Sequence, residues 1–277
     1  MARTMAATTD QLNPTLAAWR HWDVTPTLAR PPTLGPVWAE GSGHRLYALE
    51  DHPTLCIRLR HRPTSTVTGG FARELAAWTT AAHRGLAPHL AYVARAEEIV
   101  VCERIYPGNT SLCGKALGTL ARAIHQLPST PYALCLHQVL NDYLTQLPAE
   151  RKQEWQTVVG SPRVAHALRL LEQDTPRLCH NDLTAGNLLY RQEQLIAIDW
   201  EYAAMGSRYF DIAIAMAPLP CDAQAALLET AFDGKPDSEL LAAGTLIAEI
   251  CTQLWQACFA ATTPLETVLW SHEDKVI

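Results

Sequence analysis

The chain has 277 residues, of which 48% are hydrophobic and 18% are charged, so it can bury a sizeable core and is not a disordered protein. Its net charge of -6 lacks the excess of Lys and Arg that a nucleic-acid-binding face needs, and no basic run favours an acidic membrane surface. We therefore expect neither nucleic acid nor a membrane among its partners.

The cysteine pattern and the apolar stretches indicate where the protein works. The eight cysteines include no C-x-x-C pair, and each lies in an apolar or mixed stretch, where a free thiol behaves as a small hydrophobe. The first 22 residues lack the apolar centre of a signal peptide. The apolar stretch 241–260 contains Glu249, Gln253 and Gln256, which is typical of a core helix rather than a membrane span. We expect a soluble protein of the cytoplasm.

The N-terminal part of the chain predicts a β-rich body. A helix is expected at residues 10–22. Short apolar runs bounded by Gly and Pro predict strands at residues 37–40, 45–49, 55–59, 92–94 and 99–103. Residues 71–83 have helical periodicity, and the Gly-Leu-Ala-Pro run that follows ends the helix.

From residue 111 onward the pattern is mostly helical. Helices are expected at residues 112–126, 132–146, 150–159, 163–173, 223–232 and 240–261, with a short β-like insert at residues 188–190 and 195–198. A β-rich part followed by a helical part predicts an α+β fold with two lobes, residues 1–106 and 107–277, and a ligand cleft between them.

The most informative segment is residues 180–187, His-Asn-Asp-Leu-Thr-Ala-Gly-Asn, followed by a strand that ends at Asp199. This is the H-x-D-x-x-x-x-N spacing of a kinase catalytic loop, with a second aspartate twelve residues after the asparagine. Phosphoryl transfer needs an aligned acceptor hydroxyl and cations that bridge the phosphates. We expect Asp182 to take the hydroxyl proton, and Asn187 and Asp199 to hold Mg²⁺, which prefers oxygen ligands. Gly186 is expected to let the loop turn.

This loop, with the later runs Trp-Glu-Tyr-Ala at 200–203 and Phe-Asp-Ile-Ala at 210–213, resembles the choline kinase and thiamine kinase group of the aminoglycoside phosphotransferase superfamily. The resemblance implies a two-lobed, protein-kinase-like fold and an ATP- and Mg²⁺-dependent kinase that phosphorylates the hydroxyl of a small molecule. It also implies that Asp211 braces the catalytic loop. An ordinary capped turn would require neither Asp199 nor Asp211.

The same resemblance implies a nucleotide site in the N-terminal lobe. The expected contacts to ATP come from Gly41, Ser42, Gly43, Arg58, Glu74, Glu103 and Ile105. Arg58 stands where the family has a phosphate-binding lysine, and Glu74 is expected to pair with it. The glycine-containing turn is equally typical of a simple hairpin, and the backbone of Glu103 and Ile105 is expected to bind adenine.

Three residues are candidates for binding the acceptor: Glu201, Tyr202 and Trp255. A carboxylate with aromatic faces suits an organic cation, which gains about 0.5–2 kcal/mol per ring from cation–π attraction. A cationic alcohol such as choline or thiamine is therefore the expected acceptor, although Trp255 taken alone is slightly more typical of a core residue. His125 and His180 are expected to be structural.

Two other functions remain open at this level. One is an amino-sugar or aminoglycoside kinase, and the other is a nucleotide-binding pseudokinase with a regulatory role. The presence of Asp182, Asn187 and Asp199 counts against the pseudokinase, because such proteins usually lack one of these residues.

Overall fold

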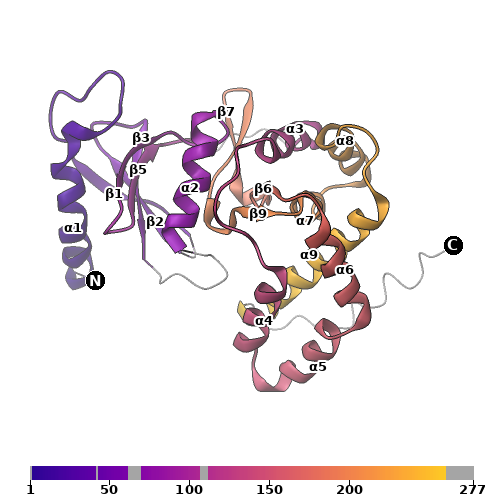
Figure 1. The fold of residues 1–277 in the computed structure, drawn as a ribbon. Helices are drawn as coiled ribbons and strands as arrows, with labels where there is room; N and C mark the ends of the chain where they lie inside the picture. Colours follow the sequence, from indigo (N-terminus) through magenta and orange to yellow (C-terminus); the bar gives the residue numbers. More distant parts are fainter. Residues whose placement is uncertain (1, 42, 62–69, 107–111, 260–277) are drawn as a thin grey trace.

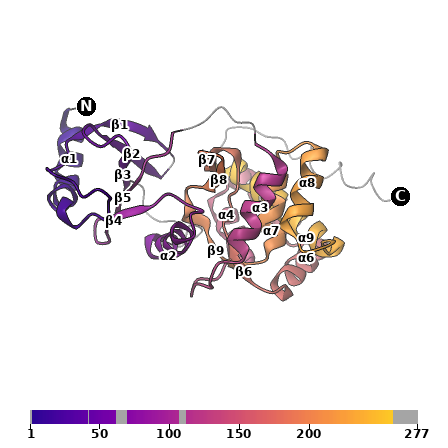
Figure 2. The same ribbon diagram turned by 90° about the horizontal axis from the view of Figure 1, so that it is seen from above.

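The structure, a computed structural model, describes residues 2–41, 43–61, 70–106 and 112–259. It has a β-rich N-terminal lobe and a mainly helical C-terminal lobe, joined side by side (Figures 1 and 2). The predicted α+β, two-lobed fold is confirmed. Within the described part of the chain, no helix has both the length and the apolar character that crossing a membrane requires.

The N-terminal lobe is built on a five-stranded antiparallel sheet in the order β1-β2-β3-β5-β4. Its strands are β1 (Leu34–Glu40), β2 (His44–Leu49), β3 (Leu55–Arg60), β4 (Leu90–Ala94) and β5 (Ile99–Glu103). All five were predicted, with ends within a few residues. The helix predicted at residues 10–22 is observed as α1 (Ala2–Ala17), which begins eight residues earlier, and the 3₁₀ turn η1 (Trp19–His21). Helix α2 (Gly70–His83) connects β3 to β4.

The two faces of β3 carry different residues because side chains alternate along a strand. Leu55, Ile57 and Leu59 pack into an outer core with α1 and η1. Cys56 and Arg58 point to the opposite face, toward α2 and the C-terminal lobe. Figure 1 shows α1 on the outer side of the sheet and α2 between the sheet and the second lobe. The inward face of β3 is therefore the one available for chemistry.

The C-terminal lobe is a set of helices around two short β-pairs. The helices are α3 (Gly114–His125), α4 (Leu136–Gln146), α5 (Ala149–Val159), α6 (Pro162–Gln173), α7 (Arg208–Met216), α8 (Cys221–Ala231) and α9 (Ser238–Phe259). The β-pairs are β6 (Arg177–Cys179) with β9 (Ala204–Gly206) and β7 (Leu188–Arg191) with β8 (Gln194–Ala197), and the 3₁₀ turns η2 (Ala185–Asn187) and η3 (Trp200–Tyr202) adjoin them. The sequence did not predict α7, β6 or β9.

Glycines allow two helix pairs of this lobe to pack closely. A Cβ at Gly244 of α9 would clash with the backbone carbonyl of Tyr209 in α7. A Cβ at Gly118 of α3 would clash in the same way with Leu227 of α8. These approaches fix α7 against the long helix α9, and α7 carries Asp211 toward the catalytic loop.

Candidate active site

Asp182 lies in the loop after β6 and directly follows Asn181, whose backbone is in the left-handed conformation. Asn181 has φ = 63°, a region that Asn tolerates better than most residues. The predicted turning residue, Gly186, does not adopt a left-handed φ, and a Cβ there would meet no atom within 4 Å. The sharp change of direction is therefore located at Asn181, beside the expected catalytic base.

A buried carboxylate holds this loop in place. Asp211 accepts hydrogen bonds from the N–H groups of Asn181 (2.6 Å) and His180 (3.3 Å) and from Nε2 of His125 (2.8 Å). Burial alone would raise the pKa of Asp211, but the bond from His125, its charge and that of His180 hold this pKa below its ordinary value. His180 in turn donates from Nε2 to the carbonyl of Ile198 (3.0 Å). Both histidines are thus structural, as expected.

Asp182 is oriented by Asn187 from the end of η2. The amide nitrogen of Asn187 donates to Oδ2 of Asp182 (2.6 Å) and to its backbone carbonyl (3.0 Å). Burial, and then the negative charge of Asp199, raise the pKa of Asp182 to about 7. A carboxylate that gains and loses a proton near neutral pH suits a general base.

Arg58 and Asp199 connect the two lobes through an ion pair. Nη2 of Arg58 lies 2.7 Å from Oδ1 of Asp199, which follows β8, and Nη1 lies 2.5 Å from Oε1 of Glu74 in α2. The predicted pairing of Arg58 with Glu74 is present. A second contact between lobes comes from Arg73 of α2, which donates to the backbone carbonyls of Tyr202 (2.9 Å) and Ala203 (3.0 Å).

Glu201 lies apart from the other candidate acceptor residues. Its carboxylate faces the N-terminal lobe, with Oε2 3.9 Å from Nη2 of Arg60, and it does not line the cavity that contains Tyr202 and Trp255. Burial, together with the charges of Asp199 and Glu74, raises the pKa of Glu201 to about 7. The Glu201 carboxylate therefore does not face the acceptor cavity, whereas the sequence led us to expect that it binds the acceptor.

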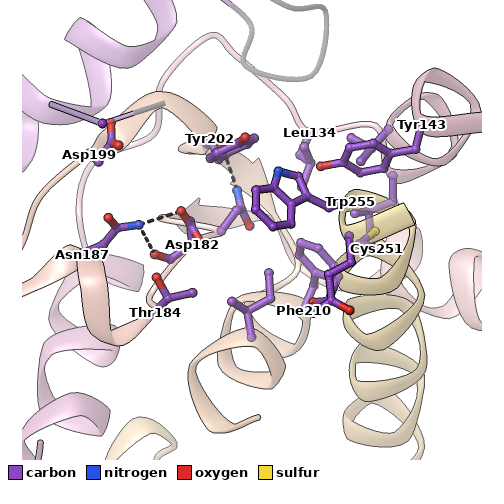
Figure 3. A pocket seen from close by; sticks show the side chains of 17 residues that line it. Leu134, Tyr143, Asp182, Thr184, Asn187, Asp199, Tyr202, Phe210, Cys251 and Trp255 are labelled. Carbon is purple, nitrogen blue, oxygen red and sulfur yellow. Dashed lines mark hydrogen bonds between the residues drawn. The ribbon is translucent and has the colours of Figure 1, made fainter. Parts of the chain in front are cut away.

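One cavity of about 510 Å³ opens beside Asp182 in the C-terminal lobe. Four aromatic side chains line it, from Tyr143, Tyr202, Phe210 and Trp255. Figure 3 shows Tyr143, Phe210 and Trp255 on one side of the cavity and Asn187 and Asp199 on the other, with Tyr202 and Asp182 between them. Among the described lining residues, Asp182 and Asp199 are the acidic ones, so the aromatic end carries no carboxylate.

A second cavity, of about 360 Å³, lies under the five-stranded sheet. It is mostly apolar and includes Trp38, Leu46, Trp78, Leu189 and Ile198. Glu103 and Ile105 at the end of β5 line it, and so does Arg58. The N–H of Glu103 is already donated to the carbonyl of His89 (2.9 Å), and the N–H of Arg104 to Thr54 (2.7 Å).

The two cavities meet over three residues that line both of them: Gly41, Asn187 and Asp199. Gly41 belongs to the turn between β1 and β2, where its N–H donates to the carbonyl of His44 (2.9 Å). Gly43 lines neither cavity, and Ser42 lies outside the described residues. A molecule in one cavity can therefore approach a molecule in the other at this junction.

The oxygen ligands available at the junction suit Mg²⁺. They are the carboxylate of Asp199 and the side-chain carbonyl of Asn187, both oxygen ligands of the kind that a hard cation prefers. The guanidinium of Arg58 is already paired with Oδ1 of Asp199, so this carboxylate is in contact with a positive charge. His44, Asp199 and Glu201 also bring ligand atoms within 4.8 Å of one another. The His44 ring, however, contacts Arg58 (3.0 Å) and Arg60 (3.3 Å), which makes that second set less suitable.

Sequence reasoning missed three contributors to the site: His44, Arg60 and Tyr143. Burial and the charges of Arg58 and Arg60 lower the pKa of His44 to about 2, so the ring stays neutral between the two arginines. Tyr143 reaches the acceptor cavity from α4. The alternation of β3, which places Arg60 on the same face as Arg58, was the available signal for Arg60.

Comparison with known proteins agrees with this arrangement. The sequence profile of the phosphotransferase enzyme family (APH) matches residues 39–244, more than half of the chain. Protein LicA of Haemophilus influenzae is 46% identical over 56 residues, an alignment that spans 20% of this chain and only 21% of LicA.

Solved structures share the fold at low sequence identity. A choline/ethanolamine kinase family protein from Mesorhizobium loti has a TM-score of 0.65 with 19% identity, covering 89% of this chain and 84% of that one. Choline kinase LicA from Streptococcus pneumoniae has a TM-score of 0.60 with 15% identity over 82% and 84% of the two chains. An aminoglycoside-3'-phosphotransferase of type VIII has a TM-score of 0.57 with 20% identity over 87% and 98%. The chain belongs to the phosphotransferase enzyme family.

Proposed function

We propose that this protein is an ATP- and Mg²⁺-dependent kinase that phosphorylates the hydroxyl of a cationic alcohol such as choline or thiamine. The observation that carries the proposal is the pair of cavities that share Gly41, Asn187 and Asp199, with the proton-accepting carboxylate of Asp182 on the acceptor side of that junction. The eight cysteines are free thiols, which fits a cytoplasmic location.

In this proposal ATP occupies the apolar cavity under the sheet. The carbonyl of Glu103 and the N–H of Ile105 bind the adenine, because the N–H groups of Glu103 and Arg104 are used within the sheet. The guanidinium of Arg58 contacts the phosphates while Glu74 holds it in position. The turn at Gly41 covers the phosphate chain where it leaves the cavity.

The acceptor hydroxyl is placed next to Asp182. Asn187 fixes the orientation of the Asp182 carboxylate, which takes the hydroxyl proton as the acceptor oxygen bonds to the γ-phosphorus of ATP. The bond from that phosphorus to the bridging oxygen breaks, and ADP leaves with that oxygen. Bound Mg²⁺, held by Asn187 and Asp199, would neutralise the negative charge of the phosphates. The raised pKa of Asp182 makes it basic enough to accept the proton near neutral pH.

The lining of the acceptor cavity favours a cationic alcohol over an amino sugar. Four rings line this cavity, and rings attract an alkylated cation without hydrogen bonds. A polyol with several ammonium groups would need carboxylates around its whole outline, and the acidic groups among the described lining residues are Asp182 and Asp199. The pseudokinase alternative is disfavoured because Asp182, Asn187 and Asp199 converge at the junction of the cavities.

A substrate panel tests this function. Purified protein with ATP and Mg²⁺ is offered choline, ethanolamine, thiamine, kanamycin or N-acetylglucosamine, and phosphorylated product is measured. We expect choline or thiamine to give the highest kcat/KM. Turnover of kanamycin or N-acetylglucosamine above both cations would contradict the acceptor, and no turnover of any alcohol would favour the pseudokinase.

The aromatic cavity is tested separately with Trp255→Ala. We expect the KM for the cationic alcohol to rise about tenfold while the KM for ATP stays unchanged, because the ring stabilises the cation equally in the ground and transition states. Phe259→Ala is the matched control, since Phe259 is an exposed ring on the same helix, 5.8 Å from the Trp255 ring, and does not line the cavity. A neutral isostere of choline, with carbon in place of nitrogen, should be a poor substrate and lose little more in Trp255→Ala. If the parent enzyme uses the isostere as well as choline, the cation-binding role fails.

A further inference from the structure

Two cysteines face each other on neighbouring strands of the N-terminal sheet. Cys56 of β3 lies directly opposite Cys102 of β5 in the antiparallel register. The N–H of Arg104 donates to the carbonyl of Thr54, and hydrogen-bonded pairs alternate along such a ladder, so Cys56 and Cys102 also form a hydrogen-bonded pair. The Cα atoms of such a pair are about 5.5 Å apart, which lies within the range that a disulfide spans.

The two sulfur atoms are in contact but not bonded. Sγ of Cys56 lies 3.6 Å from Sγ of Cys102, and both residues are free thiols. Closing this gap to the bond length of about 2.05 Å requires each sulfur to move by less than about 1 Å. The register thus already holds the two thiols in position to be joined.

Both thiols line the cavity under the sheet, together with Leu46, Trp78 and Ile105. Their residues are only 1% and 4% exposed, so the cavity is the route by which a small reagent reaches them. Arg58 follows Cys56 by two residues on the same face of β3. A change at this pair is therefore a change in the wall of the nucleotide cavity.

We propose that Cys56 and Cys102 form an oxidation site within the nucleotide cavity, where a peroxide converts the dithiol to a disulfide and thereby weakens nucleotide binding. The proposal rests on the proposed function only in taking this cavity as the nucleotide site. In the first step, one thiol is oxidised to a sulfenic acid as the peroxide O–O bond breaks, and hydrogen peroxide yields one water. In the second step, the other sulfur attacks the sulfenic sulfur, the S–S bond forms, and a second water leaves.

The contact between the two thiols also affects their chemistry. The hydrogen bond with Cys56, followed by burial, raises the pKa of Cys102 well above the usual value. Either sulfur can be the one that the peroxide oxidises, and the other then serves as the resolving thiol, because the two are in direct contact. Bound nucleotide fills the cavity that the peroxide must enter, so it protects the pair.

The test uses full-length protein in which the three exposed cysteines are replaced (C113S, C135S and C221S), so that exposed thiols do not crosslink molecules. This protein is treated with hydrogen peroxide with or without Mg²⁺-ATP, and peptides are mapped by mass spectrometry under non-reducing conditions. We expect a Cys56–Cys102 linkage, an increase of about tenfold or more in the Kd for ATP, full recovery with dithiothreitol, and protection by nucleotide.

Variants separate this pair from other oxidation. Cys56→Ala and Cys102→Ala should each abolish the reversible loss of affinity, measured against their own untreated Kd. Cys179→Ala, which removes a buried cysteine outside both cavities, should still show the reversible loss of affinity for ATP. The proposal is overturned if no Cys56–Cys102 linkage forms, if the linkage leaves the Kd unchanged, or if Cys56→Ala responds like the parent. Reduced protein that binds no nucleotide would instead contradict the proposed function, and the peptide map would still show whether the two thiols join.

Discussion

Asp182 combines two features that act in the same direction on a carboxylate, deep burial and a nearby negative charge. Both raise its pKa, to about 7, while the short bond from Asn187 stabilises the charged form and limits the rise. The residue thus remains able to ionise inside a cavity, which is what a proton acceptor needs. Asn187 therefore serves this site twice, as an orienting donor through its nitrogen and as a proposed metal ligand through its oxygen.

The first prediction concerns Asp182→Asn. An amide preserves the size of the side chain but cannot take a proton, so we expect kcat to fall by about 10²–10⁴-fold. The Kd for ATP should stay within about twofold, because Asp182 does not line the nucleotide cavity. Steady-state kinetics and calorimetric titration with ATP measure the two effects. A near-normal kcat would remove Asp182 from the catalytic role.

The second prediction concerns Asp211→Asn. The substitution removes a buried charge that accepts three hydrogen bonds, and we expect the free energy of unfolding at pH 7 to fall by about 3 kcal/mol. The folded pKa of Asp211 is lowered, so its stabilisation is complete above the unfolded pKa of about 3.8 and is lost as the pH falls through the folded pKa.

The difference between the parent and Asp211→Asn should therefore be largest above about pH 4 and shrink below it. Urea unfolding at several pH values measures this difference. A constant difference from pH 7 down to pH 3 would mean that Asp211 is not charged in the folded protein.

At the scale of elements, the sequence predicted the helices and strands whose apolar residues are periodic and whose ends are marked by turn residues. The five strands of the N-terminal sheet and the helices other than α7 have local signals. The nine-residue helix α7 is buried along most of its length, and a short apolar run of this kind does not distinguish a helix from a strand. The strands β6 and β9 have three residues each, and their pairing depends on a partner about thirty residues away.

Helix α4 illustrates how tertiary contacts move an element boundary. Its apolar pattern begins at residue 132, but the helix starts at Leu136. The backbone at Tyr132 and Leu134 instead exchanges hydrogen bonds with Met205, each of 2.8 Å. A long-range backbone pairing of this kind leaves no mark in the local sequence.

In the candidate site, too, residues close together in the sequence were predicted, whereas contacts between distant segments were not. Asp182, Asn187 and Asp199 lie within one short stretch, so their spacing predicted their convergence. The orientation of the Glu201 side chain could not be predicted from the local sequence, because its carboxylate faces Arg60. Arg60 is distant in the sequence and belongs to the other lobe.

The third prediction concerns the contact between helices α7 and α9. Gly244→Ala places a methyl group against the carbonyl of Tyr209, so the helices must separate, and we expect the free energy of unfolding to fall by about 1–3 kcal/mol. Gly186→Ala is the matched control for stability, since its added methyl group meets no atom within 4 Å. Thermal and urea unfolding of both variants provide the comparison. Equal stability of the two variants would mean that α7 and α9 do not pack as closely as described.

At the scale of the whole molecule, the two lobes meet through charged contacts centred on the junction of the cavities. Arg58 reaches Asp199 across the boundary, and Arg73 holds η3 against α2. The residues that would bind phosphate and metal are thus the same ones that join the lobes. Nucleotide binding and lobe contact are expected to depend on each other.

The fourth prediction concerns Asp199→Ala. Removing this carboxylate takes away a proposed metal ligand, so the affinity for ATP should no longer increase when Mg²⁺ is added. Titrations with ATP, with and without Mg²⁺, measure the effect in the parent and in the variant. An unchanged Mg²⁺ dependence in Asp199→Ala would contradict its role as a ligand.

The shared wall of the two cavities also has a consequence for inhibitor chemistry. Since Gly41, Asn187 and Asp199 border both spaces, a single molecule that passes beside these residues would contact both cavities. A bisubstrate compound, with adenosine joined through a phosphate chain to a quaternary ammonium head, would fill both ends together. Tethering makes the second contact intramolecular, so such a compound should bind more tightly than either half by a factor of about 10² or more.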